Sequence, residues 1–133
     1  MIVVDTNVIA YLFIPGDRTS HARDALRKDP EWVAPLLWRS EFLNILAFYL
    51  RQGQILLRYA NQLMQEAERL MKGGEYQVPS NEVLSLVETS GCSAYDCEFV
   101  ALAKEMEIPL VTTDKRLIKA FPSLAIHVTN FIS

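Results

Sequence analysis

The chain has 133 residues, of which 50% are apolar and 22% are charged, and its formal net charge is −3. This length suits one domain with a core of its own, so we expect a single domain over residues 1–133. The composition excludes a disordered or fibrous protein, and the 13 basic against 16 acidic residues exclude a strongly basic tail that binds nucleic acid.

Short apolar segments alternate with helical ones along the chain. The first half predicts, in order, strand Ile2–Val4, helix Thr6–Phe13, helix Thr19–Lys28, strand Trp32–Ala34, helix Leu36–Arg51 and helix Ile55–Lys72. The second half predicts strand Tyr76–Val78, helix Asn81–Thr89, helix Ser93–Met106, strand Leu110–Thr112, helix Lys115–Phe121 and strand Ala125–Val128. This alternation is typical of an α/β fold with a parallel central sheet.

The cysteines and the hydropathy pattern favour a cytoplasmic protein. Cys92 and Cys97 fit a reduced protein better than a disulfide framework, and we interpret both as small apolar residues on a buried face. Their C-x4-C spacing and the widely separated His21 and His127 argue against a zinc site. The apolar runs fall short of the ~20 residues that a membrane span needs, and the N-terminus lacks a targeting signal, so we expect no membrane partner.

Common catalytic motifs are absent from the sequence. The chain has no G-x-G-x-x-G, no G-x-x-x-x-G-K-[ST], no G-x-S-x-G and no H-E-x-x-H. Four acidic residues in unusual positions remain as candidates for a functional site.

Two of these acids stand between a predicted strand and a predicted helix. Asp5 follows Ile2–Val4, and Asp114 follows Leu110–Thr112 after one further residue. Ligands of open parallel sheets gather at the carboxyl ends of the strands, so both carboxylates are expected at one edge of the sheet. Each aspartate is also suited to cap the helix that it precedes, and capping is compatible with metal binding.

Glu41 lies in the middle of an apolar helix. With Asn44 it forms a polar pair in an otherwise apolar stripe. A buried carboxylate is costly unless it is paired or metal-bound. A functional role is therefore favoured over the alternative, a salt bridge to Arg39 or Arg18.

Asp96 follows Ser93 in a pattern that resembles a capping box. Apolar residues three, four and seven positions later also place Asp96 at the start of a core-facing stripe, so it is expected to point toward the sheet. Glu98 belongs to a different face, and we interpret it as solvated surface.

Four converging carboxylates repel one another and raise each other's pKa, and a divalent cation removes that conflict. Oxygen ligands suit Mg²⁺ or Mn²⁺ better than zinc. Such a site can stabilise the charge that develops during phosphodiester hydrolysis. The residues therefore indicate metal-assisted hydrolysis of a phosphodiester.

Four short blocks resemble, in order and over nearly the full chain, those of the PIN-domain ribonucleases. They are Val4-Asp5-Thr6-Asn7-Val8, Ser40-Glu41-Phe42-Leu43-Asn44, Tyr95-Asp96 with Ala101-Leu102-Ala103, and Thr112-Thr113-Asp114-Lys115-Arg116-Leu117. The size is most similar to the toxin of a VapBC-type toxin–antitoxin pair. The resemblance implies a doubly wound three-layer α/β/α sandwich with a short parallel central sheet.

The resemblance also implies a site and partners for an endoribonuclease. The metal ligands and catalytic residues, for Mg²⁺ or Mn²⁺, would be Asp5, Glu41, Asp96 and Asp114. Residues that help to place water and substrate would be Asn7, Ser40, Asn44 and Thr113. The family is usually dimeric, and its toxins bind a small antitoxin protein whose tail blocks the acidic site. Candidate substrates that the resemblance suggests are tRNA and the large-subunit ribosomal RNA loop.

Surface residues extend these expectations. Candidates for an exposed apolar interface are Phe48, Tyr49, Leu56, Leu57 and Tyr59. Candidates for binding RNA phosphates, with ordinary surface ion pairs as the alternative, are Arg18, Arg39, Lys115 and Arg116.

Two other functions compete with a ribonuclease. One is a catalytically silent PIN-like module that only binds protein or RNA. The other is an acidic-site phosphatase of the haloacid-dehalogenase type, which is disfavoured because Asn7 stands where that class has its second aspartate.

Overall fold

The computed structural model describes residues 1–133, in which five strands and eight helices follow one another along the chain. The N-terminal part contains β1 Ile2–Val4, α1 Thr6–Phe13, α2 Thr19–Lys28, β2 Trp32–Pro35, α3 Leu37–Arg51 and α4 Leu57–Met71. The C-terminal part contains β3 Glu75–Tyr76, α5 Ser80–Ser90, α6 Ala94–Met106, β4 Leu110–Thr112, α7 Lys115–Ala120, β5 Ala125–His127 and α8 Val128–Ile132.

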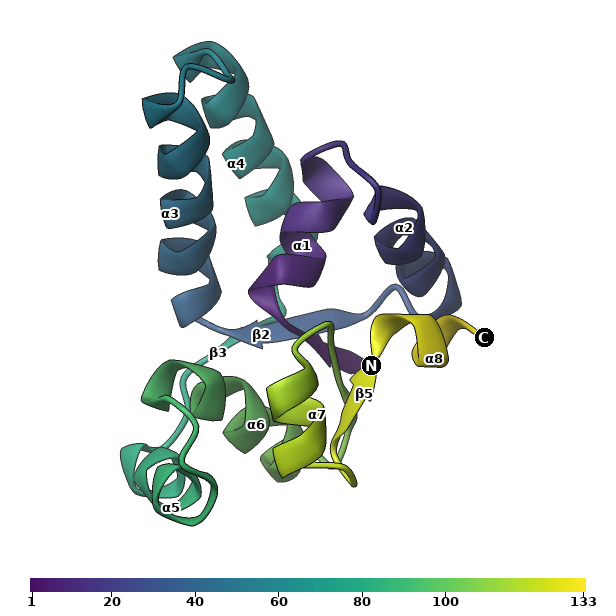
Figure 1. Ribbon diagram of the computed structural model, residues 1–133, viewed down its shortest axis with the longest axis vertical. Helices are drawn as coiled ribbons and strands as arrows, with labels where there is room; N and C mark the ends of the chain where they lie inside the picture. Colours follow the sequence, from purple (N-terminus) through teal and green to yellow (C-terminus); the bar gives the residue numbers. More distant parts are fainter.

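The five strands form one parallel sheet in the order β3-β2-β1-β4-β5. Helices α1 to α4 lie on one side of this sheet, and α5, α6 and α7 lie on the other (Figure 1). The predicted α/β fold with a parallel central sheet is therefore confirmed. Because the chain moves outward from β1 to β3 and then returns to β4, the strand order reverses between β1 and β4, where ligands of such sheets bind.

The core lies between the sheet and the helices on both of its faces. It is a cluster of 31 buried residues, to which β1 contributes three consecutive apolar side chains. From α3, Trp38 and Phe42 are fully buried, with ring centroids 6.2 Å apart. Cys97 is also buried, as predicted, whereas Cys92 is only half-buried and lines a cavity, which corrects the prediction for that residue.

Two elements near the sheet edges differ from the predictions. The strand expected over residues 76–78 lies at Glu75–Tyr76, where the backbone of Gly74 approaches β2 so closely that a Cβ would lie 2.4 Å from the Trp32 carbonyl oxygen. The last strand ends at His127, whose ring nitrogen accepts a hydrogen bond from the backbone N–H of Thr129 and starts α8. A five-residue helix is too short to show a helical period in the sequence.

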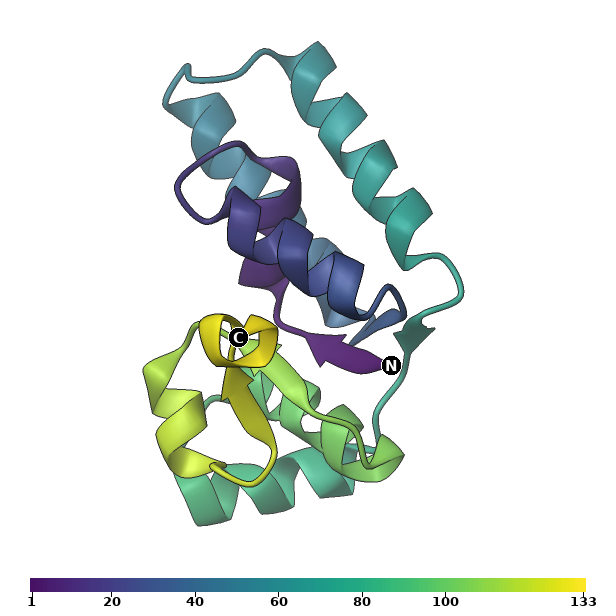
Figure 2. The same ribbon diagram turned by 90° about the vertical axis from the view of Figure 1, so that its right-hand side faces the viewer.

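Two further features concern the helices. Helices α3 and α4 form a hairpin whose connection projects away from the sheet in both views (Figure 1, Figure 2). None of the helices combines the length and the apolarity needed to cross a membrane.

Candidate active site

All four predicted acids line one pocket of about 250 Å³ beside the carboxyl ends of β1 and β4. Its lining consists of Asp5, Thr6, Asn7, Glu41, Asn44, Ile45, Asp96 and Asp114. The structure thus brings together acids from the β1–α1 junction, α3, α6 and the β4–α7 junction. Of the other predicted site residues, Asn7 and Asn44 also line the pocket, whereas Ser40 and Thr113 do not.

Asp5 is the most buried acid of the pocket, with 9% of its surface exposed. It stands at the start of α1, but its side chain makes no capping hydrogen bond, so the capping alternative is wrong for this residue. Its Oδ2 instead accepts a hydrogen bond of 2.7 Å from Thr112 Oγ1 in β4. Burial raises the pKa of Asp5, the Thr112 bond opposes that rise, and the charges of Asp96 and Asp114 add to it.

Asp114 does cap its helix. Its Oδ1 accepts a hydrogen bond of 2.9 Å from the backbone N–H of Arg116, and its Oδ2 lies 3.6 Å from the Arg116 guanidinium. The backbone N–H of Asp114 donates in turn to Thr112 Oγ1 at 3.0 Å. One hydroxyl, that of Thr112, therefore contacts both aspartates of the predicted strand–helix pairs.

Glu41 is held by a hydroxyl rather than by an arginine. Its Oε1 accepts a hydrogen bond of 2.7 Å from Thr6 Oγ1. The predicted alternative of a salt bridge is wrong, because Arg39 pairs with Glu68 at 2.7 Å and Arg18 stacks over a tyrosine ring. Burial raises the pKa of Glu41, and the Thr6 bond lowers it.

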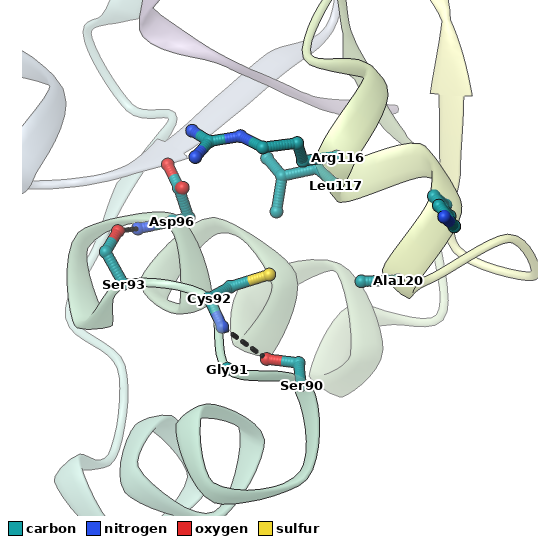
Figure 3. Close-up of a pocket in the computed structure, with 9 residues that line it drawn as sticks. Ser90, Gly91, Cys92, Ser93, Asp96, Arg116, Leu117 and Ala120 are labelled. Carbon is teal, nitrogen blue, oxygen red and sulfur yellow. Dashed lines mark hydrogen bonds between the residues drawn. The ribbon is translucent and has the colours of Figure 1, made fainter.

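Asp96 lies in the first turn of α6 and is half-buried. The Ser93 side chain accepts a hydrogen bond of 3.1 Å from the backbone N–H of Asp96 (Figure 3). The Asp96 carboxylate is not used in this cap, and the residue lines the acidic pocket. Burial raises the pKa of Asp96, and the nearby charge of Asp114 raises it further.

Glu98 corrects a prediction. Its interpretation as solvated surface is wrong, because it is half-buried, and burial raises the pKa of its own carboxyl. It is also close enough for its charge to add to the rise in the pKa of Glu41, after burial and the charges of Asp5 and Asp96. The position of α6 beside the sheet, which the sequence does not specify, brings this fifth acid near the pocket.

Sequence reasoning missed two hydroxyl residues that hold the acids, Thr6 and Thr112. Both belong to the sequence blocks that surround the predicted aspartates, so the sequence shows that they are near the site. It does not show which carboxylates they contact. Thr113, which the sequence predicts near the site, instead has its hydroxyl 3.3 Å from the hydroxyl of Tyr11.

The donors in the pocket suit a hard divalent cation. They are carboxylate, amide and hydroxyl oxygens, without a cysteine or histidine. No group of three or more His, Cys, Asp or Glu side chains is arranged to enclose an ion, and separate donors hold Asp5, Glu41 and Asp114. Mg²⁺ commonly binds through one or two carboxylates and retains several waters, so its chemistry fits this pocket without such a cage.

The PIN domain profile matches residues 2–121, a range that contains all four acids, and the chain belongs to the PIN-domain family. This confirms the family that the four sequence blocks indicated. Among curated proteins, Ribonuclease VapC3 of Pyrobaculum aerophilum is 29% identical over 126 residues, which cover 92% of this chain and 96% of that protein.

Solved structures share the fold at lower identity. A protein of Pyrobaculum aerophilum superposes with a TM-score of 0.79 and 21% identity, covering 98% of this chain and 92% of the other. FitAcB of Neisseria gonorrhoeae gives a TM-score of 0.71 at 20% identity, covering 97% and 99%. A toxin–antitoxin complex of Klebsiella pneumoniae gives 0.68 at 17% identity, covering 96% and 98%.

Proposed function

We propose that this protein is a divalent-metal-dependent endoribonuclease whose active site is the acidic pocket. The observation that carries the proposal is the convergence of four carboxylates from four separate segments on one pocket of a PIN-domain fold. Burial and mutual repulsion raise the pKa of Asp5 and of Asp96, so this arrangement is unfavourable to a protein without a cation. The similarity to a ribonuclease supports RNA as the substrate.

We assign metal binding to Asp5, Glu41, Asp96 and Asp114, with Mg²⁺ or Mn²⁺ as the cation. A bound cation supplies positive charge that stabilises the negative charge developing on the phosphate. The chain's own hydroxyls, from Thr6 and Thr112, fix the directions of two of the carboxylates.

The uncharged residues of the pocket have a different role. Asn7 and Asn44 are exposed and line the pocket, so their amides are available to hydrogen-bond RNA. Ser40 and Thr113 lie outside the lining, and we assign them no contact with the substrate.

We further propose that the protein is the toxin of a toxin–antitoxin pair, acts in the cytoplasm and forms a homodimer. The similarity in fold to the toxin–antitoxin complex of Klebsiella pneumoniae supports the pairing with an antitoxin. The exposed apolar side chains of Phe48, Leu56, Leu57 and Tyr59, at the projecting end of the α3–α4 hairpin, supply an interface for a second copy or an antitoxin. Tyr49, predicted to belong to this patch, is half-buried and lines a cavity instead.

An RNA cleavage assay tests the proposed activity. The protein should cut single-stranded RNA with Mg²⁺ or Mn²⁺ and lose that activity in EDTA. Folded protein that binds RNA without cutting it at any metal concentration would indicate the silent PIN-like module. Hydrolysis of a chromogenic phosphomonoester without RNA cleavage would indicate the phosphatase.

A further inference from the structure

A second cavity adjoins the acidic pocket on the side of α7. Its volume is about 510 Å³, within the range of cavities that hold small ligands. Asp96 lines both cavities, so a chain that crosses the acidic pocket can continue directly into this one. Figure 3 shows Asp96 and Ser93, from α6 and the residue that caps it, on one wall, and Arg116, Leu117 and Ala120, from α7, on the facing wall.

The charge of this second cavity is opposite to that of the acidic pocket. Arg116 and Lys119, both from α7, line it. The Arg116 side chain is 84% exposed and has one weak ion pair, at 3.6 Å to Asp114. Lys119 forms no salt bridge in the structure. Both cations are therefore available to an anionic ligand.

The cavity on the other side of the acidic pocket is different. Its volume is about 280 Å³, and it shares Asn7 and Ile45 with the acidic pocket. Its cation, Arg18, already lies over the ring of Tyr11, 5.4 Å from the centroid, and donates to the tyrosine hydroxyl at 3.3 Å. Of the two flanks, the α7 side thus offers the less engaged positive charges.

From this geometry we propose that the cavity between α6 and α7 binds the RNA nucleotide next to the cleaved bond, with Arg116 and Lys119 holding its phosphate. The proposal rests on the proposed ribonuclease function and names a subsite for that substrate. An RNA strand is repelled by four carboxylates, and two cations at the edge of the pocket offset that repulsion for the neighbouring phosphate. Leu117 and Ala120 supply an apolar surface beside the cations.

Binding measured without cleavage tests this subsite. A fluorescein-labelled single-stranded RNA oligonucleotide is titrated in EDTA, at several salt concentrations, against the parent and against the double variant Arg116→Gln/Lys119→Gln. Glutamine at position 116 retains the backbone N–H that donates a hydrogen bond to Asp114. The variant should bind at least about tenfold more weakly at low salt, with a salt slope smaller by about 0.7 for each phosphate that it no longer neutralises.

The matched control is Arg69→Gln/Lys72→Gln. This pair has the same residue types and spacing, is exposed at the end of α4, and forms no salt bridge. It removes the same net charge, so it should leave affinity and salt slope close to those of the parent. Equal losses in both double variants would show a general charge effect and overturn the subsite.

Cys92 provides a second, local measurement. It lines the cavity and is half-buried, whereas Cys97 is fully buried, so a maleimide should react with Cys92 first. RNA should slow that reaction in the parent but not in Arg116→Gln/Lys119→Gln. RNA binding that leaves the reaction of Cys92 unchanged would place the strand elsewhere.

The two proposals fail in distinguishable ways. If the parent cuts RNA but the α7 variant binds like the parent, the subsite is wrong and the ribonuclease function stands. If the parent neither binds nor cuts RNA, the proposed function is wrong and the subsite is wrong with it.

Discussion

The β1–α1 and β4–α7 junctions look alike in the sequence but hold their aspartates in different ways. Asp5 follows β1 directly, and its backbone N–H still bonds to the Val111 carbonyl in the sheet, so its side chain is buried against Thr112. Asp114 stands one residue further beyond its strand, has left the sheet, and caps α7. A difference of one residue thus separates an acid whose hydrogen bond is long-range from an acid whose hydrogen bond is local.

The largest expected effect is on catalysis, and there the two junctions should be alike. Asp5→Asn and Asp114→Asn should each reduce RNA cleavage at least about 100-fold, the usual scale for the loss of a positioned charge-stabilising group. Initial rates on labelled RNA check this, with the exposed Asp24→Asn as a control that should retain full activity. Undiminished cleavage by a folded Asp5→Asn variant would contradict the assigned site.

A divalent cation should stabilise the parent more than it stabilises the Asp5→Asn variant. A cation that binds only the folded state adds about 2.7 kcal/mol at a hundredfold excess over its dissociation constant. Melting curves with and without Mn²⁺ should therefore show a rise in Tm for the parent and a smaller rise for Asp5→Asn. If Mn²⁺ leaves the Tm of the parent unchanged, the assignment of a metal site is wrong.

The next effect should distinguish the junctions through Thr112. Thr112→Val removes the hydroxyl that donates to buried Asp5, and an unsatisfied buried polar group costs about 1–3 kcal/mol. The matched variant Thr113→Val removes a hydroxyl with one long contact to Tyr11 and should change stability by less than about 0.5 kcal/mol. Urea unfolding of both variants in EDTA measures the difference in the free energy of unfolding. Equal losses of stability in the two variants would show that the Thr112 hydroxyl contributes no more than that of Thr113.

The pH dependence of stability should follow the buried acid. Because the folded pKa of Asp5 is raised above its ordinary value of 3.8, the metal-free folded state holds more protons than the unfolded state. The contribution of Asp5 to stability is then greatest below pH 3.8. It falls as pH rises through the folded pKa, by up to about 1.4 kcal/mol per pH unit. Asp5→Asn should flatten that fall in a series of unfolding curves in EDTA. A parent protein whose stability rises with pH over this range would contradict the predicted direction.

The smallest effect should appear at the cap. Asp114→Ala removes the acceptor of the Arg116 N–H and should cost about 1 kcal/mol, whereas Asp114→Asn retains an acceptor and should cost less. Unfolding measured in EDTA at neutral pH separates the two. Equal stability of the alanine and asparagine variants would show that the cap contributes nothing.

Patterns within short segments predict most of the fold and the four acids. Apolar strands that end in a polar residue, such as Ile2–Val4 before Asp5, identify both the sheet and its functional edge. The interruption of an apolar helix identifies Glu41. These signals require only neighbours within about one helical turn.

The rest depends on contacts between distant parts of the chain. The bond from Thr6 to Glu41 spans 35 residues and that from Thr112 to Asp5 spans 107, so no local pattern reveals them. The half-burial of Glu98 and the start of α8 at Val128 likewise follow from tertiary packing. The sequence favours Thr113 over Thr112 because it shows which residues are near Asp114, not which of them faces Asp5.

The pairing of β1 with β4 has a consequence for the order in which the protein becomes active during synthesis. The bond between Asp5 and Thr112 joins residues 107 positions apart, and ribosomes add about 5–20 residues per second. The first acid therefore leaves the ribosome about 5–20 seconds before its partner strand. Throughout that interval the nascent chain lacks a complete acidic pocket, so the proposed nuclease activity can begin only after the segment around Asp114 has left the ribosome.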